Sequence, residues 1–164
     1  MYRMKNRDQL EFEDFYLPFG GKLRSDNRWV KLAKLIPWDE LEQRYASLFS
    51  EDRGAPAKPF RMALGALIIK ERLGLTDEET VEHIRETPYL QYLIGFNEYR
   101  DEAPFDPSMM VHFRKRLTDE IINDINERIV REAREQSKEK SGDNEKGNTR
   151  NGTESAGERL WFPV

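Results

Sequence analysis

Few residues of this chain have the types and spacing that catalytic or metal chemistry requires. The 164 residues include no cysteine and two histidines, His83 and His112. Neither histidine belongs to a His-Glu-x-x-His or Cys/His pattern, so the sequence predicts no metal site and no cofactor. The acids at positions 77–79 directly follow Thr76, which is the arrangement of a capping box at a helix start. We therefore interpret these carboxylates as structural and assign no catalytic residue.

Positive charge gathers in two short segments, although the whole chain has a net charge of −4. Residues 58–73 hold four basic and one acidic residue, and residues 105–118 hold three basic and one acidic; the intervening 74–104 hold two basic and eight acidic. An acidic chain can bind DNA only through a local basic face, because phosphate neutralisation acts at short range. We predict that the second segment contacts bases or phosphates through Arg114, Lys115 and Arg116. For the first segment we predict phosphate contacts only, made by Lys58, Arg61, Lys70 and Arg72.

Helical patterns dominate residues 26–140, and no segment alternates as a strand would. A helix is predicted over residues 60–73, and its segment 62–69 is apolar on all sides, which is typical of a helix at the centre of a bundle. Further helices are predicted between proline, glycine and N-cap signals. We expect an all-α bundle of about six helices with helix-turn-helix-like elements.

The two ends of the chain differ from this helical domain. Residues 1–25 are predicted to form an extended arm that docks on the bundle, because its segment 15–21 contains three aromatics, Phe15, Tyr16 and Phe19, beside Pro18 and two glycines. Residues 141–164 include eleven Gly, Asn, Ser or Thr among 24, a composition that predicts a disordered tail. No apolar run approaches the roughly 20 residues of a membrane span, so we expect no membrane association.

The predicted helix at 107–117 carries the sharpest functional signal. Met110, Phe113 and Leu117 form its inner stripe, and the basic residues at 114–116 lie off that stripe and should face solvent. Short capped helices followed by a basic amphipathic helix are typical of helix-turn-helix DNA readers. An ordinary solvated helix face would carry the same three charges, so this pattern alone leaves both interpretations open.

Several sequence blocks occur in a fixed order: Leu17–Leu23, Asp26–Ala33, Gly54–Leu67, Leu75–Glu82, Pro88–Gly95, Phe105–Ser108 and Phe113–Leu117. Together they resemble the N-terminal domain of InsH-type insertion-sequence transposases, which belong to the DDE class. The resemblance implies a helical domain that binds the terminal inverted repeats of a mobile element, in double-stranded DNA, during transposition. It also implies a bacterial cytoplasmic protein associated with the nucleoid.

The resemblance stops before the catalytic half of that family. In relatives, strands after the long helix carry three acidic residues that hold divalent metals such as Mg²⁺. Here no hydrophobic strand follows Ala133, and the sequence ends in Trp161–Val164. We therefore expect a truncated copy without catalysis, its abrupt ending the result of a frameshift or premature stop, and expect Mg²⁺ only for the missing domain.

Two alternative functions are open. The apolar stripe from Ile121 to Ala133 could pair with another copy or with full-length transposase, which would make the chain an interaction module that modulates the intact enzyme. An active nuclease would instead need strand-borne carboxylates, for which the sequence offers no candidate.

Overall fold

Seven helices form in the computed structural model, which describes residues 2, 14–49 and 57–142. Among these residues no strand forms, and one isolated parallel bridge joins Tyr16 to Glu98. The all-α prediction is therefore confirmed, with seven helices where about six were expected. The predicted tail lies outside the described residues, apart from two residues that complete the last helix. The helices are α1 (Arg28–Leu35), α2 (Trp38–Ala46), α3 (Phe60–Leu73), α4 (Asp77–Glu86), α5 (Pro88–Leu93), α6 (Met109–Arg116) and α7 (Asp119–Gly142).

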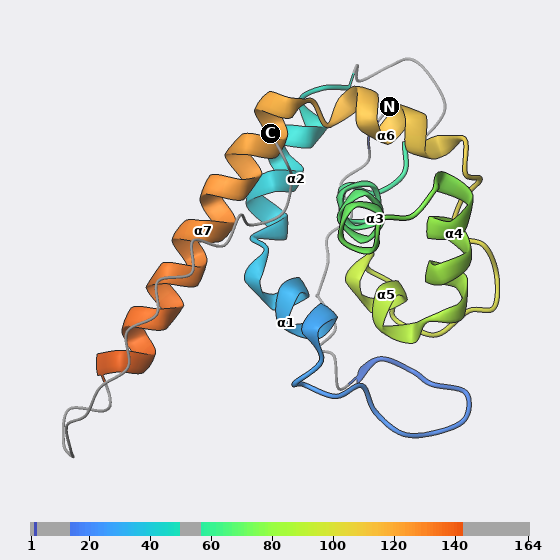
Figure 1. The fold of residues 1–164 in the computed structure, drawn as a ribbon, viewed down its shortest axis with the longest axis horizontal. Coiled ribbons are helices and arrows are strands. Elements are labelled where there is room, and N and C mark those ends of the chain that lie inside the picture. Colours follow the sequence, from blue (N-terminus) through green and yellow to red (C-terminus); the bar gives the residue numbers. More distant parts are fainter. Residues whose placement is uncertain (1, 3–13, 50–56, 143–164) are drawn as a thin grey trace.

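Helix α3 lies at the centre, seen end-on in Figure 1, with α2, α4, α5 and α6 packed around it. Every residue from Phe60 to Ile69 is buried, which explains why this segment is apolar on nearly all sides. Gly65 allows α5 to approach closely, because a Cβ there would lie 3.0 Å from Cγ2 of Ile94. Gly74 ends the helix in the left-handed conformation, with φ of 65°, as its sequence position predicts.

Two helix starts follow the predicted capping chemistry. The side chain of Asn27 accepts a hydrogen bond from the Trp29 amide at 2.8 Å and so caps α1. At α4, the Thr76 hydroxyl accepts from the Glu79 amide at 3.1 Å, and the Glu79 carboxylate accepts from the Thr76 amide at 2.8 Å. These bonds to Thr76 hold the pKa of Glu79 below its usual value. The capping box is confirmed.

Helix α6 begins at Met109, slightly later than its sequence pattern predicts. The Asp106 carboxylate accepts from the Ser108 amide at 2.9 Å, and this turn occupies the positions before the first helical residue. The inner stripe is as predicted, with all three of its members buried: Met110, Phe113 and Leu117.

A buried glutamine joins α4, α5 and the segment after them. The Gln91 side chain is fully buried, and its Nε2 donates to the carbonyls of Ile84, Arg85 and Arg100 at 3.1, 2.9 and 2.8 Å. Its Oε1 accepts from the Arg100 amide at 2.8 Å. One amide therefore holds the polar segment 97–101 against the end of α4.

The first half of α7 packs against α1 and α2, and its second half extends away from the other helices (Figure 1). Two ion pairs fix it to α2: Arg44 with Asp124 at 2.6 Å, and Arg128 with Glu40 at 2.8 Å. The apolar stripe of α7 faces the chain's own helices, where Ile122, Ile125 and Ile129 are buried. These three side chains are therefore not available for pairing with a second copy of the chain.

The aromatic arm docks only in part. Phe15 is buried, with its ring centre 6.2 Å from that of Tyr92 in an edge-to-face contact. Tyr16 is 63% exposed and Phe19 is 95% exposed. The described part of the arm therefore docks through Phe15, while Tyr16 and Phe19 remain exposed.

Candidate nucleic-acid interface

The first predicted contact, Arg114 on α6, is engaged by an acid from α4. Its Nη1 and Nη2 donate to Oδ1 and Oδ2 of Asp77, each at 2.8 Å. Lys70, in the last turn of α3, places its Nζ 3.2 Å from the same Oδ1. The bond from Arg114 holds the pKa of Asp77 below its usual value, with Lys70 adding to the effect. Asp77 therefore joins three helices, and Arg114 does not present an uncompensated charge.

The other two residues of the triplet differ from each other. Arg116 is half-buried, and its guanidinium carbon lies 4.8 Å from the centre of the Phe49 ring. Burial raises the pKa of the neighbouring Tyr45 hydroxyl, and Arg116 partly offsets that rise. Lys115 is exposed and makes no ion pair with any residue of the described ranges. The predicted ridge of three outward cations thus contains one unengaged cation.

Arg61 lies in the core, which corrects its assignment as a phosphate contact. Its side chain is 5% exposed, and its Nε and Nη2 donate to the carbonyls of Leu93 and Tyr92 at 2.9 and 2.8 Å. The guanidinium carbon also lies 4.9 Å from the centre of the Trp38 ring. A phosphate cannot reach this group without opening the core, so Arg61 serves the carbonyls at the end of α5.

The remaining cations of the second basic segment do not form one patch. Lys58 is half-buried before α3, with its Nζ 3.5 Å from the Pro104 carbonyl. Lys70 and Arg72 are in the last turn of α3, roughly 18 Å further along the helix axis. Lys70 also donates to the Leu75 carbonyl at 2.7 Å. Arg72 is exposed and lies near α1, with its guanidinium carbon 5.9 Å from the centre of the Trp29 ring.

A third basic segment escapes a coarse count of charge along the sequence. Residues 22–34 hold five basic residues and one acid, a net charge of +4, but residues 1–57 as a whole are balanced. A window of about 13 residues would have found it. All five cations are exposed, and we call them the α1 basic face: Lys22, Arg24, Arg28, Lys31 and Lys34.

Helix α1 positions this face by burying its other side. Three of the cations recur every third residue, at Arg28, Lys31 and Lys34, while the buried residues Trp29, Val30, Leu32 and Ala33 pack inward. Arg28 and Arg72 both lie against the Trp29 ring, with guanidinium carbons 4.9 and 5.9 Å from its centre. Arg72 of α3 therefore joins the edge of the α1 basic face.

One acid lies within the face. Asp26 pairs with Arg24, with Nη2 and Oδ2 2.7 Å apart, and this bond lowers the pKa of Asp26. The Arg24 amide donates to the Tyr89 hydroxyl at 3.1 Å, which ties the segment to α5. The charge of Arg24 is consequently compensated by Asp26.

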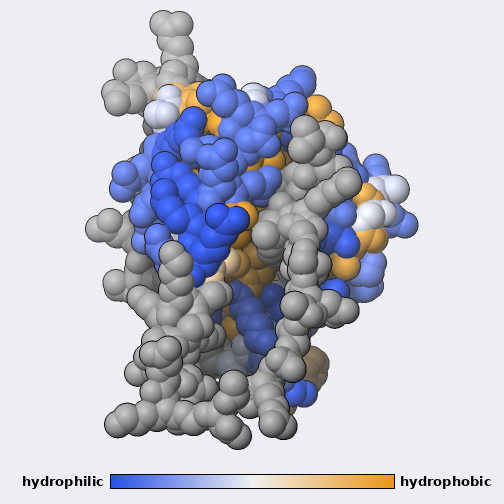
Figure 2. Space-filling model, turned by 60° about the vertical axis from the view of Figure 1, so that its left-hand side comes forward, coloured by the Kyte–Doolittle hydropathy of each residue, from blue (hydrophilic) through white to orange (hydrophobic). Residues whose placement is uncertain are grey.

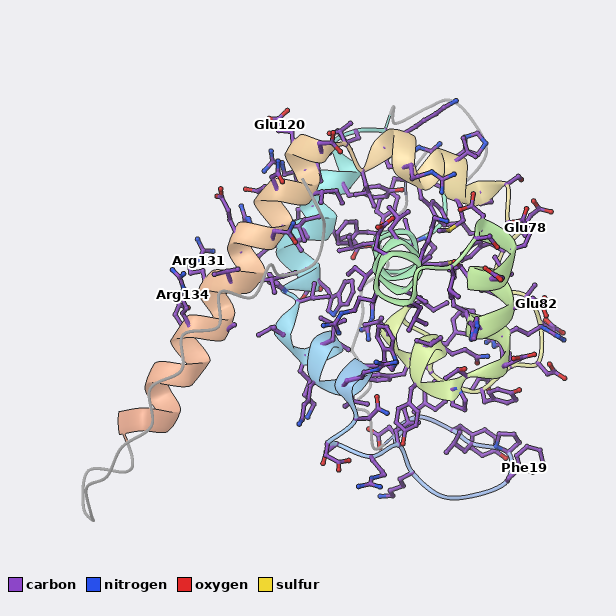
Figure 3. All side chains as sticks on the ribbon, in the orientation of Figure 1. Phe19, Glu78, Glu82, Glu120, Arg131 and Arg134 are labelled. Atoms are coloured by element: carbon purple, nitrogen blue, oxygen red, sulfur yellow. The ribbon has the colours of Figure 1, made fainter. Side chains whose placement is uncertain are left out.

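Negative charge is concentrated on a different part of the surface. Figure 3 shows Glu78 and Glu82 pointing outward from α4, on the side of the molecule away from α1 and α7. The side that carries α7 is largely hydrophilic over its described residues, with some hydrophobic side chains between (Figure 2). A polyanion would be repelled from α4 and attracted toward α1.

The described residues offer no metal centre. No group of three or more His, Cys, Asp or Glu side chains among them is arranged to hold a metal ion, and both histidines are exposed on separate helices. Within the same ranges, no helix has the length and apolar character needed to cross a bilayer.

Comparison with known proteins defines the class of this helical body. The model of the transposase domain family DUF772 matches residues 18–116, from the turn in the aromatic loop to the end of α6. The match covers more than half of the chain, which belongs to this transposase-domain family.

One curated relative has no assigned function. It is the uncharacterized protein ORF8 in the nfe locus of Rhizobium meliloti, 39% identical over 88 residues that make up 54% of this chain and 42% of that protein. The chain thus spans less than half the length of this relative. No solved structure matches the chain.

Proposed function

We propose that this chain is the DNA-binding N-terminal portion of an insertion-sequence transposase and recognises the terminal inverted repeats of its element. Membership of a transposase-domain family supports the transposase role. The observation that carries DNA binding is the α1 basic face, where five exposed cations lie within 13 residues.

The α1 basic face suits a DNA backbone because its cations are exposed while its helix is rigidly packed. Phosphate contacts of this kind fix the register of a protein on the duplex, and base contacts add specificity. If the four cations other than Arg24 each neutralise one phosphate, the logarithm of the affinity falls with a slope of about −3.6 against the logarithm of salt. Raising salt fourfold then weakens binding by roughly 150-fold.

The α6 triplet is the competing surface. In Figure 1, α6 and α1 lie at opposite ends of the body, with α3 between them. A short straight duplex on the α1 basic face therefore leaves α6 uncovered. Helix-turn-helix readout by Arg114, Lys115 and Arg116 stays a prediction, which a direct comparison of the two surfaces tests.

The experiment compares two triple variants by fluorescence anisotropy, using the ends of the nearest matching mobile element and a scrambled duplex. The first variant is Arg28→Ala/Lys31→Ala/Lys34→Ala, and the second, matched in charge, is Arg114→Ala/Lys115→Ala/Arg116→Ala. Circular dichroism confirms that each variant is folded.

The first variant is expected to weaken binding and to make the salt slope about 2.7 less steep, while the second stays close to the parent. Loss of binding only in the α6 variant would assign the interface to α6. Equal affinity for scrambled DNA would refute repeat recognition, and binding indifferent to salt would refute phosphate contact altogether.

We propose further that this chain does not itself cut DNA. Support comes from several of the described carboxylates, Glu79, Asp77 and Glu40 among them, which are engaged at a helix start or in ion pairs. Incubation of the chain with element ends and Mg²⁺ should leave the strands intact. Metal-dependent nicking at a repeat end would contradict this part of the proposal.

A further inference from the structure

Phe19 projects from the aromatic loop, the part of the arm between Phe15 and Leu23. The Gly20 amide donates to the Leu17 carbonyl at 3.1 Å, which closes a four-residue turn with Pro18 second and Phe19 third. Proline in the second position and glycine in the fourth are favoured in type I turns. Phe19 is 95% exposed, and Figure 3 shows it at the outer edge of the loop, away from the helices.

The loop is fixed on both sides of this turn. Phe15 before it and Leu23 after it are both buried. The Tyr16 amide donates to the Asn97 carbonyl at 3.0 Å, and the Tyr99 amide donates to the Tyr16 carbonyl at 2.9 Å. The exposed ring is therefore presented by an anchored backbone, so little further ordering is needed to bury it against a ligand.

The surroundings of the ring favour an anionic ligand that can approach closely. Gly20 and Gly21 have φ of 78° and 90°, and no heavy atom lies within 4 Å of where their Cβ atoms would be. Lys22 comes next, exposed and without an ion pair in the described ranges, and is the first residue of the α1 basic face. The acid at the base of the loop, Glu98, is paired with Arg100 at 2.8 Å.

We infer that Phe19 is a wedge that stacks on an unstacked base of the duplex held by the α1 basic face. The inference rests on the proposed DNA-binding function and names a contact within it. Apolar side chains flanked by Lys and Arg enter the minor groove and partly unstack a base step. Every base offers an aromatic face to such a ring, so the contact does not depend on sequence.

The test uses the full chain and two short duplexes of one mixed sequence, fully paired or with one unpaired adenine at the centre. The unpaired base is easier to unstack, so the parent should bind that duplex more tightly, by about tenfold. Phe19→Ala should abolish this preference and leave the salt slope unchanged, and Phe19→Tyr should keep the preference.

A matched control removes an exposed apolar side chain elsewhere. Leu48 is 48% exposed and follows α2, whose C-terminal end lies across the body from the loop (Figure 1). Leu48→Ala should retain both the affinity and the preference.

The outcomes separate this inference from the proposed function. If the parent binds the paired duplex in a salt-dependent manner and shows no preference, or if Phe19→Ala keeps the preference, the wedge is refuted and DNA binding stands. Binding to neither duplex refutes both. A change in sedimentation mass of the free Phe19→Ala chain would assign the loop to a protein contact and also overturn the wedge.

Discussion

Replacing Arg61 by alanine should reduce stability and leave DNA binding by the folded chain unchanged. The substitution removes a buried guanidinium that donates to two carbonyls at the end of α5 and lies against the Trp38 and Tyr92 rings. It leaves a cavity in the centre of the fold and removes one hydrogen bond from each of the Leu93 and Tyr92 carbonyls, of which Tyr92 keeps its bond from the Gly95 amide.

The magnitude follows from the contacts. Two hydrogen bonds from a charged donor contribute about 1.5 kcal/mol each, and two cation–π contacts contribute about 0.5–1 kcal/mol each. Part of this total is offset, because the variant no longer desolvates a guanidinium on folding. We expect Arg61→Ala to lower the free energy of unfolding by about 3 kcal/mol, and Arg61→Lys, which keeps the charge without the planar fork, by roughly half as much.

Urea denaturation followed by tryptophan fluorescence measures this change, since the Trp38 ring lies beside the substituted group. Lys115→Ala, an exposed residue with the same change of charge, is the control and should shift stability by less than about 0.5 kcal/mol. The reasoning is refuted if Arg61→Ala retains the parent's stability and instead weakens DNA binding with a shallower salt slope, because Arg61 would then contact phosphate.

Two further predictions concern polar groups that hold the helices together. Gln91→Leu should lower the free energy of unfolding by about 3 kcal/mol in urea denaturation, because it removes the side-chain partner of the Arg100 amide and of the Arg85 and Arg100 carbonyls. A loss below about 1 kcal/mol would contradict this. Asp77→Asn should cost about 1 kcal/mol at neutral pH by weakening the pair with Arg114. The pKa of Asp77 is lowered in the fold, so its contribution to stability is complete above its unfolded pKa of about 3.9 and disappears as pH falls through the folded pKa. The free energies of unfolding of parent and variant should therefore become equal in acid. A difference that stays constant with pH would refute the assignment.

Local signals in the sequence predicted the helices well. The limits of α3, the left-handed Gly74 and the Thr76 capping box all depend on residues within a few positions of each other. Chemistry of this kind is readable without knowledge of the tertiary fold. The docking of the aromatic arm was predicted less well, because burial of Phe15 and exposure of Phe19 depend on where the turn directs the chain.

The candidate site was harder to predict, because a charge count treats every cation as solvated. Asp77 and Arg114 are 37 positions apart, and they meet because α4 and α6 both pack on α3. Arg61 did carry a signal, since it lies in the first turn of a helix and directly precedes the apolar run 62–69. The α1 basic face was obscured by averaging over residues 1–57, where distant acids cancel it in the sum.

Helix α7 has a mechanical consequence for anything joined to its far end. Its 24 residues make a rod of about 36 Å, clamped to α2 near its start and extending away from the body. A helix of this kind fixes both the distance and the orientation of whatever follows it. One inserted residue in its outer half would rotate an attached body about the helix axis by about 100°, whereas seven would return it to within roughly 20° of its original orientation.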